Sequence, residues 1–304
     1  MNLSSTFCRM AIGVCAAFTL AAPVLAEDID IYAGVNATSD KPNVLLILDS
    51  SANWSASISG AANCYYKSNG VLISPPVGPV DQGTKLGVEQ CALYNLVDGL
   101  PVASAGGANG DALFNVAIML MNKSPNNGTY PRQAFIALTT NNKAILKALI
   151  AGFDKNADKA SNADFGLAMY EAYLYFKGAT RLNGGYGLTG KRDDNAFSGT
   201  QYNSPSGSSC ARNYVILIGN GSPQNSAPEK SVQTLLAALP ANSQGTPNTA
   251  QIAVPLAGND AANWSDEMSR YMRYVDVSGK DDVQGIISHT VAVLKGPSDG
   301  GFPT

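Results

Sequence analysis

An apolar run at residues 44–48 passes directly into a polar segment, and this junction constrains the fold more than any other feature. The run reads VLLIL, and the segment that follows reads DSSAN. Consecutive apolar residues bounded by turn formers predict a strand buried on both faces, as in a parallel sheet. The strand would deliver Asp49, Ser51 and Asn53 to a loop at its carboxyl end. The same residues are also typical of an ordinary turn, in which such side chains accept hydrogen bonds from backbone amides.

Further segments alternate between strand and helix patterns, and residues 214–218 form a second continuous apolar strand that ends before Asn220. Helices are predicted at 85–100, at 141–152 with Thr140 or Asn141 as the cap, and at 165–177, 229–239 and 266–274. Strands are predicted at 113–121 and 133–138, as an antiparallel edge pair, and at 287–294. This alternation favours an α/β fold with a mainly parallel sheet that is covered by helices on both faces.

In sheets of this kind, ligands bind beyond the carboxyl ends of the strands. We therefore expect Asp49, Ser51 and Asn53 to share one crevice with Asn220 and with the loop at residues 162–164. Insertions are expected at about 53–84 and at 178–209, and the second is rich in Gly, Ser and Asn. Loops of that length inside a domain are usually functional or disordered.

Residues 1–26 have the pattern of a secretory signal peptide, with Arg9 in a polar start, an apolar run at 10–20 and a small residue, Ala26, at the cleavage point. No second apolar segment reaches the length of about 18 residues that a membrane helix requires, so we expect no transmembrane segment after cleavage. Removal of Arg9 leaves 19 basic and 23 acidic residues and a net charge of −4. That charge gives no electrostatic reason to expect a nucleic-acid partner.

Three cysteines, Cys64, Cys91 and Cys210, remain after removal of the signal. In an exported protein, an odd number predicts one disulfide and one leftover thiol. We expect Cys64 to pair with Cys91 and Cys210 to stay alone, because the irregular segment between the first two is one that a covalent tie would restrain. Metal binding by these thiolates is not expected, since no Cys-x-x-Cys or Cys/His spacing exists.

The residue inventory argues against an enzyme. The chain has one histidine, His289, inside a predicted strand, and it lacks the Gly-x-Ser-x-Gly elbow of many hydrolases. Paired acids at 193–194 and 281–282 stand beside Lys and Arg, which is typical of solvated charge clusters. A secreted hydrolase is therefore only an alternative to a binding protein.

Several segments carry a resemblance to a known family. They read KPNVLLILDSS from Lys41, EQCALYN from Glu89, GLAMYEAYLYF from Gly166, CARNYVILI from Cys210 and WSDEM from Trp264. Together they resemble the N-terminal von Willebrand factor A-like region of the PilY family, the type IV pilus biogenesis and tip-adhesin proteins. The resemblance implies that residues 27–304 form a von Willebrand factor A-like (Rossmann-like) domain.

In function, the resemblance implies a non-catalytic module for pilus biogenesis or pilus-mediated adhesion. Its partners would be pilus proteins or a surface receptor. Its location would be the periplasm, the cell surface or the medium. Larger family members continue into a β-propeller, and the A-type domain itself normally continues past the strand predicted at 287–294. We therefore expect a fragment, a frameshifted product or a shortened relative, with one sheet edge exposed.

Domains of this class build a metal-ion-dependent adhesion site from an Asp-x-Ser-x-Ser array, and Asp49, Ser51 and Asn53 match its positions. Two departures weaken the match: Ala163 stands where the class has Thr, and Asn220 where it has Asp. Mg²⁺ requires near-octahedral oxygen ligands and gives up its water reluctantly. The resemblance therefore implies a degenerate site.

The residues expected in that site are Asp49, Ser51, Asn53 and Asn220, and they would bind Mg²⁺ or Mn²⁺ weakly. Asn162 or Asp164 could reach in from the neighbouring loop. The alternative is a metal-free structural scaffold, or a decayed fragment without activity.

Overall fold

The computed structural model describes residues 41–58, 63–102, 112–183, 191–206, 211–221, 227–243, 264–280 and 283–293, with backbone only at 227–230. The predicted signal peptide and Cys210 lie outside these ranges. Among the described residues, no helix is long and apolar enough to cross a membrane.

A five-stranded sheet lies at the centre of the fold, in the order β5-β4-β1-β8-β9. Its strands are β1 (Asn43–Leu48), β4 (Asn115–Met121), β5 (Thr129–Ala137), β8 (Asn213–Gly219) and β9 (Ile286–Ala292). All neighbours pair in parallel except β4 and β5, which are antiparallel. The predicted fold class is thus confirmed, and so is the antiparallel edge pair.

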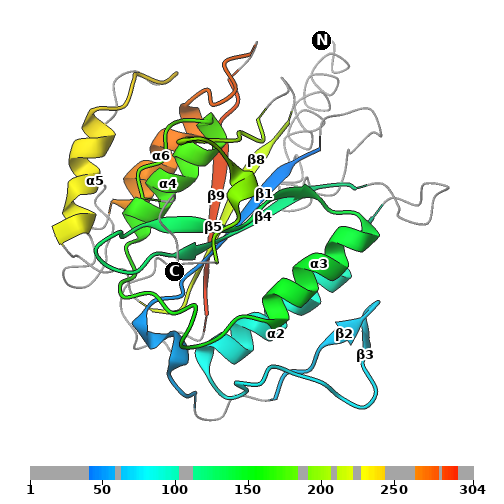
Figure 1. The fold of residues 1–304 in the computed structure, drawn as a ribbon. Coiled ribbons are helices and arrows are strands. Elements are labelled where there is room, and N and C mark those ends of the chain that lie inside the picture. Colours follow the sequence, from blue (N-terminus) through cyan, green and yellow to red (C-terminus); the bar gives the residue numbers. More distant parts are fainter. Residues whose placement is uncertain are drawn as a thin grey trace, which may run out of the picture. The chain divides into compact units, whose positions relative to one another are not determined.

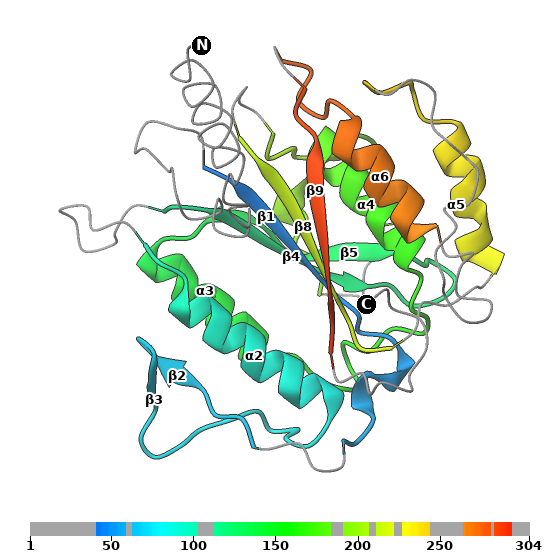
Figure 2. The same cartoon turned by 180° about the vertical axis from the view of Figure 1, so that it is seen from behind.

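Helices cover both faces of this sheet (Figures 1 and 2). On one face lie α2 (Lys85–Gly99) and α3 (Thr140–Ala151), and on the other α4 (Phe165–Lys177), α5 (Ala227–Ala237) and α6 (Ser265–Tyr274). Because side chains alternate along a strand, Leu45 and Ile47 enter the core beneath α4 while Leu46 and Leu48 enter the core beneath α2. One apolar strand therefore supplies both cores.

Two local predictions were wrong. The cap of α3 is Thr139, not Thr140 or Asn141, because the Thr139 side chain accepts a hydrogen bond from the Asn142 backbone N at 3.2 Å. The strand predicted at 133–138 begins earlier, at Thr129, and includes Pro131. A proline is tolerated there because β5 is an edge strand, where one side of the backbone makes no ladder bonds.

The described part of the first insertion contains the turn η2 (Ala52–Ser55) and a hairpin of β2 (Lys67–Ser68) and β3 (Val71–Leu72). The predicted disulfide is confirmed: Cys64 and Cys91 are bridged, with their Cα atoms 6.0 Å apart. The hairpin turns at Asn69 and Gly70, whose φ angles of 51° and 76° are those of the primed turns that suit hairpins.

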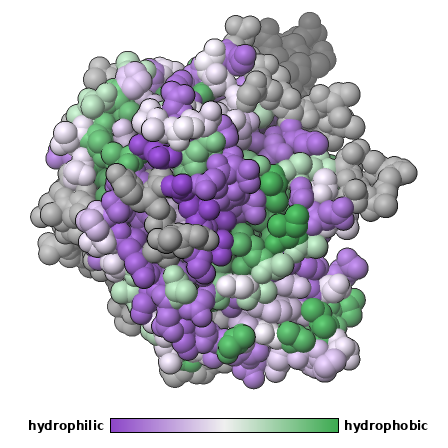
Figure 3. All heavy atoms as spheres, in the orientation of Figure 1, coloured by the Kyte–Doolittle hydropathy of each residue, from purple (hydrophilic) through white to green (hydrophobic). Residues whose placement is uncertain are grey.

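Apolar side chains on this insertion face solvent. Its exposed members are Val71, Leu72, Val77 and Val80. A cluster of hydrophobic residues is visible over the β2–β3 hairpin at the lower right of Figure 3. The disulfide and the stacking of Tyr66 on Tyr94, with ring centroids 4.1 Å apart, hold this surface against α2.

The described part of the second insertion also has structure. It contains the turn η3 (Asp194–Ala196) and the hairpin of β6 (Phe197–Ser198) and β7 (Gln201–Tyr202). Glu171 on α4, which is fully buried, anchors it: its carboxylate accepts bonds from the Tyr202 hydroxyl at 2.6 Å and from the backbone N of Leu182 and Asn183 at 3.2 and 3.0 Å.

Residues 193–194 were predicted to form a solvated charge cluster, and this prediction is wrong for Asp193 and confirmed for Asp194. The Asp193 carboxylate accepts a hydrogen bond from the Ala134 backbone N at 2.8 Å, and the Asp193 N donates to the Pro131 carbonyl at 2.9 Å. Asp193 therefore pairs with the outer edge of β5, which protects that edge. Asp194 does face solvent, with 79% of its side chain exposed, and it pairs with Arg192.

We predict that Glu171→Ala lowers the free energy of unfolding by roughly 3 kcal/mol, because it leaves the buried Tyr202 hydroxyl and two partly buried backbone N–H groups without their acceptor. Urea unfolding of the purified chain measures this change. Asp194→Ala is the matched control, and it should change stability by less than about 0.5 kcal/mol because its carboxylate is exposed. Equal stability of the two variants would contradict the anchoring role of Glu171.

Candidate functional site

The carboxyl ends of β1 and β8 lie side by side, because the two strands pair in parallel with Leu48 opposite Ile218. The Asn220 backbone N donates to the Asp49 carboxylate at 3.2 Å, and the Asn220 side-chain amide donates to the Asp49 carbonyl. Asp49 is fully buried. The two residues, 171 positions apart in the chain, are therefore in direct contact.

Ser51 and Asn53 complete this group. The Asp49 carboxylate accepts a bond from the Ser51 backbone N at 3.1 Å, and the Ser51 hydroxyl donates to Asn53 Oδ1 at 3.0 Å. Asn53 Nδ2 in turn donates to the Asn220 carbonyl at 3.5 Å. All four residues predicted for the site thus come together, and we call Asp49, Ser51, Asn53 and Asn220 the carboxyl-end cluster.

The two loops approach closely at Gly221, where the side-chain amide of Asn53 lies against the glycine. A Cβ atom at this position would lie 2.4 Å from Asn53 Nδ2. Real Cβ atoms essentially never come that close to another heavy atom, so any larger residue would push Asn53 out of the cluster.

The loop before α4 lies beside the cluster but meets it through a residue that the sequence did not indicate. The Ala160 backbone N donates to the Ser50 carbonyl at 2.6 Å. Of the two further candidates, Asp164 precedes the first residue of α4 and is buried, while Asn162 is partly exposed. Ala163, at the position of the missing hydroxyl, is buried in the core beneath α4.

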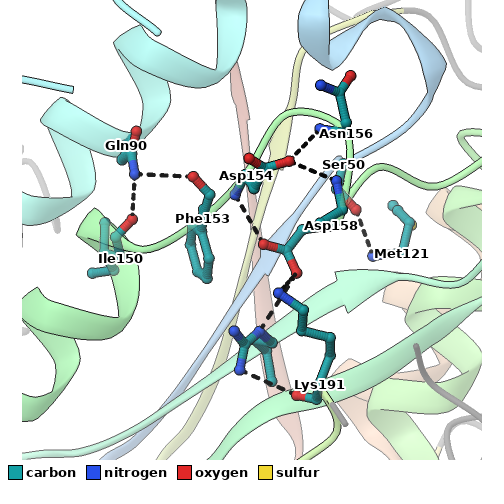
Figure 4. A network of polar contacts seen from close by, with 11 residues as sticks. Ser50, Gln90, Met121, Ile150, Phe153, Asp154, Asn156, Asp158 and Lys191 are labelled. Carbon is teal, nitrogen blue, oxygen red and sulfur yellow. Dashed lines mark hydrogen bonds and ion pairs between the residues drawn. The ribbon is translucent and has the colours of Figure 1, made fainter. Parts of the chain in front are cut away.

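A network of polar contacts holds the loop before α4 in place (Figure 4). Asp158, which is fully buried, accepts a bond from the Asp154 backbone N at 2.9 Å and pairs with Lys191 at 3.3 Å and Arg132 at 3.9 Å. Gln90 on α2 donates to the carbonyls at the end of α3, including that of Ile150 at 2.7 Å. The loop before α4 and the end of α3 are therefore held by buried or partly buried hydrogen bonds.

Two residues of α2 belong to the site and were missed by the sequence reasoning. The Lys85 ammonium donates to the Asn220 carbonyl. Glu89, one turn further along, is buried and accepts a bond from Trp54 Nε1 at 2.7 Å. Their spacing of four places both on one face of the helix, which is the only local signal. Nothing in the sequence shows that this face meets the strand ends.

Burial governs the electrostatics here. Burial raises the pKa of the Asp49 carboxyl, while hydrogen bonds from Ser51 and Asn220 and the positive charge of Lys85 act in the opposite direction. Burial also raises the pKa of the Glu89 carboxyl well above its ordinary value, and the negative charge of Asp49 raises it further. Glu89 is therefore shifted toward its neutral form.

Two acceptors in this region are buried. Glu89 Oε1 and Asn220 Oδ1 receive no donor within the described part of the chain. The side chain of Asn220 interacts with Glu89 and lowers the pKa of its carboxyl, against the larger effect of burial.

We predict that Glu89→Gln stabilises the protein at neutral pH. In the unfolded chain, Glu89 loses its proton near pH 4.5, whereas the buried carboxyl keeps it to higher pH. The folded state then binds more protons, so the free energy of unfolding falls as pH rises above about 4.5. Gln has a similar shape without the ionisable proton, so it avoids this loss.

Urea unfolding at pH 4 and pH 7 checks this prediction. The stabilisation by Glu89→Gln should be present at pH 7 and absent at pH 4. Asp194→Asn, at an exposed carboxylate, is the control and should show no such difference. A Glu89→Gln protein that is less stable than the parent at pH 7 would show that Glu89 works as a carboxylate.

The cluster does not fit a divalent cation well. Asp49 is its one carboxylate, and both of its oxygens already accept backbone N–H bonds. An ammonium group is hydrogen-bonded to the same cluster. Among the described residues, no group of three or more His, Cys, Asp or Glu could hold a metal ion. Such a donor set falls short of the oxygen shell that Mg²⁺ requires.

Comparison with known proteins does not assign a family: no family matches the sequence, and no curated protein matches it. Among solved structures, proximal thread matrix protein 1 from the mussel byssus has a TM-score of 0.34 and 10% identity over 65% of this chain and 33% of that chain. A structure of that protein with a zinc-occupied MIDAS motif has a TM-score of 0.33 and 14% identity, over 65% and 35%.

An aerotolerance-related membrane protein from Bacteroides fragilis has a TM-score of 0.34 and 12% identity, over 83% of this chain and 92% of that chain. In the first comparison, with the mussel protein, this chain spans about a third of that protein's length. At such scores and identities, we infer no function from these likenesses.

Proposed function

We propose that this chain is a non-catalytic binding module that presents the loops at the carboxyl ends of β1 and β8 to a protein partner. The observation that carries the proposal is the carboxyl-end cluster. Its inner residues are fixed by hydrogen bonds between the two loops, while Ala52, Ala56 and Ser57 on the first loop are exposed. This edge of a parallel sheet is where ligands generally bind.

The resemblance to the PilY family supports a role in type IV pilus biogenesis or pilus-mediated adhesion. The partners are then pilus proteins or a surface receptor, met in the periplasm, at the cell surface or in the medium. The Cys64–Cys91 disulfide supports export, because disulfides persist in oxidising compartments and are rare in the cytosol.

The position of His289 supports a non-catalytic role. This residue, the one histidine of the chain, is exposed on the edge strand β9, and its ring stacks on Tyr214 with centroids 6.4 Å apart. It lies on a strand rather than in the loops of the carboxyl-end cluster. The alternative of a metal-free scaffold is supported by the internal hydrogen bonding of the cluster.

We predict that Ala52→Arg impairs binding to the pilus partner by at least about tenfold, because a long charged side chain on the exposed loop keeps the partner away from the loop surface. A tenfold loss corresponds to about 1.4 kcal/mol. Binding to purified minor pilins and restoration of surface pili in a strain that lacks the gene are the two measurements.

Ala144→Arg is the matched control, since Ala144 is an exposed alanine in α3, outside the crevice. This variant should bind and restore pili as the parent does. Both variants should keep the parent melting temperature. If Ala52→Arg restored pili fully, the partner surface would have to lie elsewhere.

Metal dependence separates an adhesive site from a scaffold. We expect millimolar Mg²⁺ or Mn²⁺ to raise the melting temperature only slightly, because stabilisation by a ligand stays small unless its concentration greatly exceeds the dissociation constant. Ala163→Thr together with Asn220→Asp should enlarge the shift, and Asp49→Ala should erase it. A large shift in the parent protein that Asp49→Ala abolishes would establish metal-dependent binding instead.

A further inference from the structure

We propose that Lys85 is a built-in cation: its ammonium takes the place that a divalent ion would have among these loops, so that the carboxyl-end cluster is complete without a metal. The inference rests on the proposed function and deepens it, because it makes recognition by these loops independent of metal. The experiments below use the purified chain without a partner. The role of Lys85 can therefore be contradicted while the binding function stands, and the binding function can be contradicted while the role of Lys85 stands.

Lys85 contacts both loops, one through its backbone and the other through its charge. Its backbone N donates to the Ala56 carbonyl at 3.0 Å, on the loop that follows β1. Its ammonium donates to the Asn220 carbonyl, on the loop that follows β8. One residue of a third element, α2, therefore ties both loops together.

The position of Lys85 in the helix does not favour a positive charge. Lys85 is the first residue of α2, and the first turn contains no acidic residue. A positive charge is unfavourable at this end of a helix, because the unpaired N–H groups there carry partial positive charge. Thr84 already caps the helix by accepting a bond from the Gly87 backbone N at 3.1 Å. The compensation must come from outside the helix.

The Asn220 carbonyl supplies that compensation, because it accepts the bond from the ammonium. Asn220 is itself bonded to Asp49 through its backbone N and its side-chain amide. Asp49 is fully buried, and a buried carboxylate is costly unless a positive charge or several donors offset it. Lys85 itself is partly exposed, so a cation from solvent would have to approach a charge of the same sign.

A double-mutant cycle tests the charge coupling. Lys85→Met removes the ammonium and keeps the aliphatic stem, and Asp49→Asn removes the carboxylate charge. In urea unfolding at pH 7 and low salt, each single variant should be less stable than the parent. The double variant should be more stable than additivity predicts, by at least about fivefold in the unfolding equilibrium constant.

Lys159→Met is the matched control. Lys159 is also partly exposed, and its ammonium lies 3.4 Å from the Ser55 hydroxyl on the first loop, so this variant removes the same charge from the same region. Combined with Asn in place of Asp49, it should show additive effects. Equal coupling for Lys85 and Lys159 would overturn the proposal, since the effect would then be one of net charge.

Lys85→Arg keeps the experiment decisive if Lys85→Met does not fold. Arg preserves the charge, so this variant should fold with nearly the parent stability. If Lys85→Arg and Lys85→Met are equally damaged, shape rather than charge is required and the proposal fails. If only Lys85→Met is damaged, the proposal is supported.

Magnesium is the direct probe of the vacated position. Chelation with EDTA should leave the melting temperature of the parent unchanged. Mg²⁺ should raise the melting temperature of Lys85→Met, or of Lys85→Gln where the Met variant does not fold, more than that of the parent or of Lys159→Met. A parent protein that responds to Mg²⁺ more strongly than the Lys85 variant would overturn the proposal.

Discussion

The in-register parallel pairing of β1 with β8 is the constraint on which the site depends. It brings Leu48 opposite Ile218, so that Asp49 and Asn220 leave the sheet at the same point and bond to each other. The same strand supplies both cores, because alternate residues of β1 face the two helix layers. A change that shifted β1 by one residue would exchange the two cores and also separate the cluster.

Acidic side chains that accept backbone N–H bonds hold irregular segments to this sheet. Charged residues make up only 14% of the sequence, yet Glu171 and Asp158 are fully buried. Glu171 binds the second insertion and Asp158 fixes the loop before α4, each by accepting bonds from backbone N–H groups of the loop. Asp193, on the second insertion itself, accepts a bond from a backbone N–H at the edge of β5. Long irregular segments thereby acquire defined positions without a large core of their own.

Local patterns predicted the framework well. The two apolar strands, the helix at 165–177 and the disulfide were all indicated by the sequence: by continuous hydrophobicity, by helical spacing and by the irregular segment between Cys64 and Cys91. The errors at Thr139 and Pro131 were also local, since several cap-forming residues stand in a row and an edge strand tolerates proline.

The electrostatic part of the site was not predictable in this way. Asp49, Ser51 and Asn53 were indicated because they follow a strand, but Lys85 and Glu89 reach the cluster from a helix. Their part in the site depends on how α2 packs across the sheet, which no short window of sequence contains. Glu171 was hidden for the same reason, since its partners lie in the second insertion.

The close approach at Gly221 has a consequence for how relatives of this chain can vary. Asn53 occupies the space that a side chain at position 221 would need. A residue with a Cβ after β8 would have to displace the side-chain amide of Asn53. In relatives of this chain, we therefore expect a larger residue at that position to occur together with a different side chain at the position of Asn53.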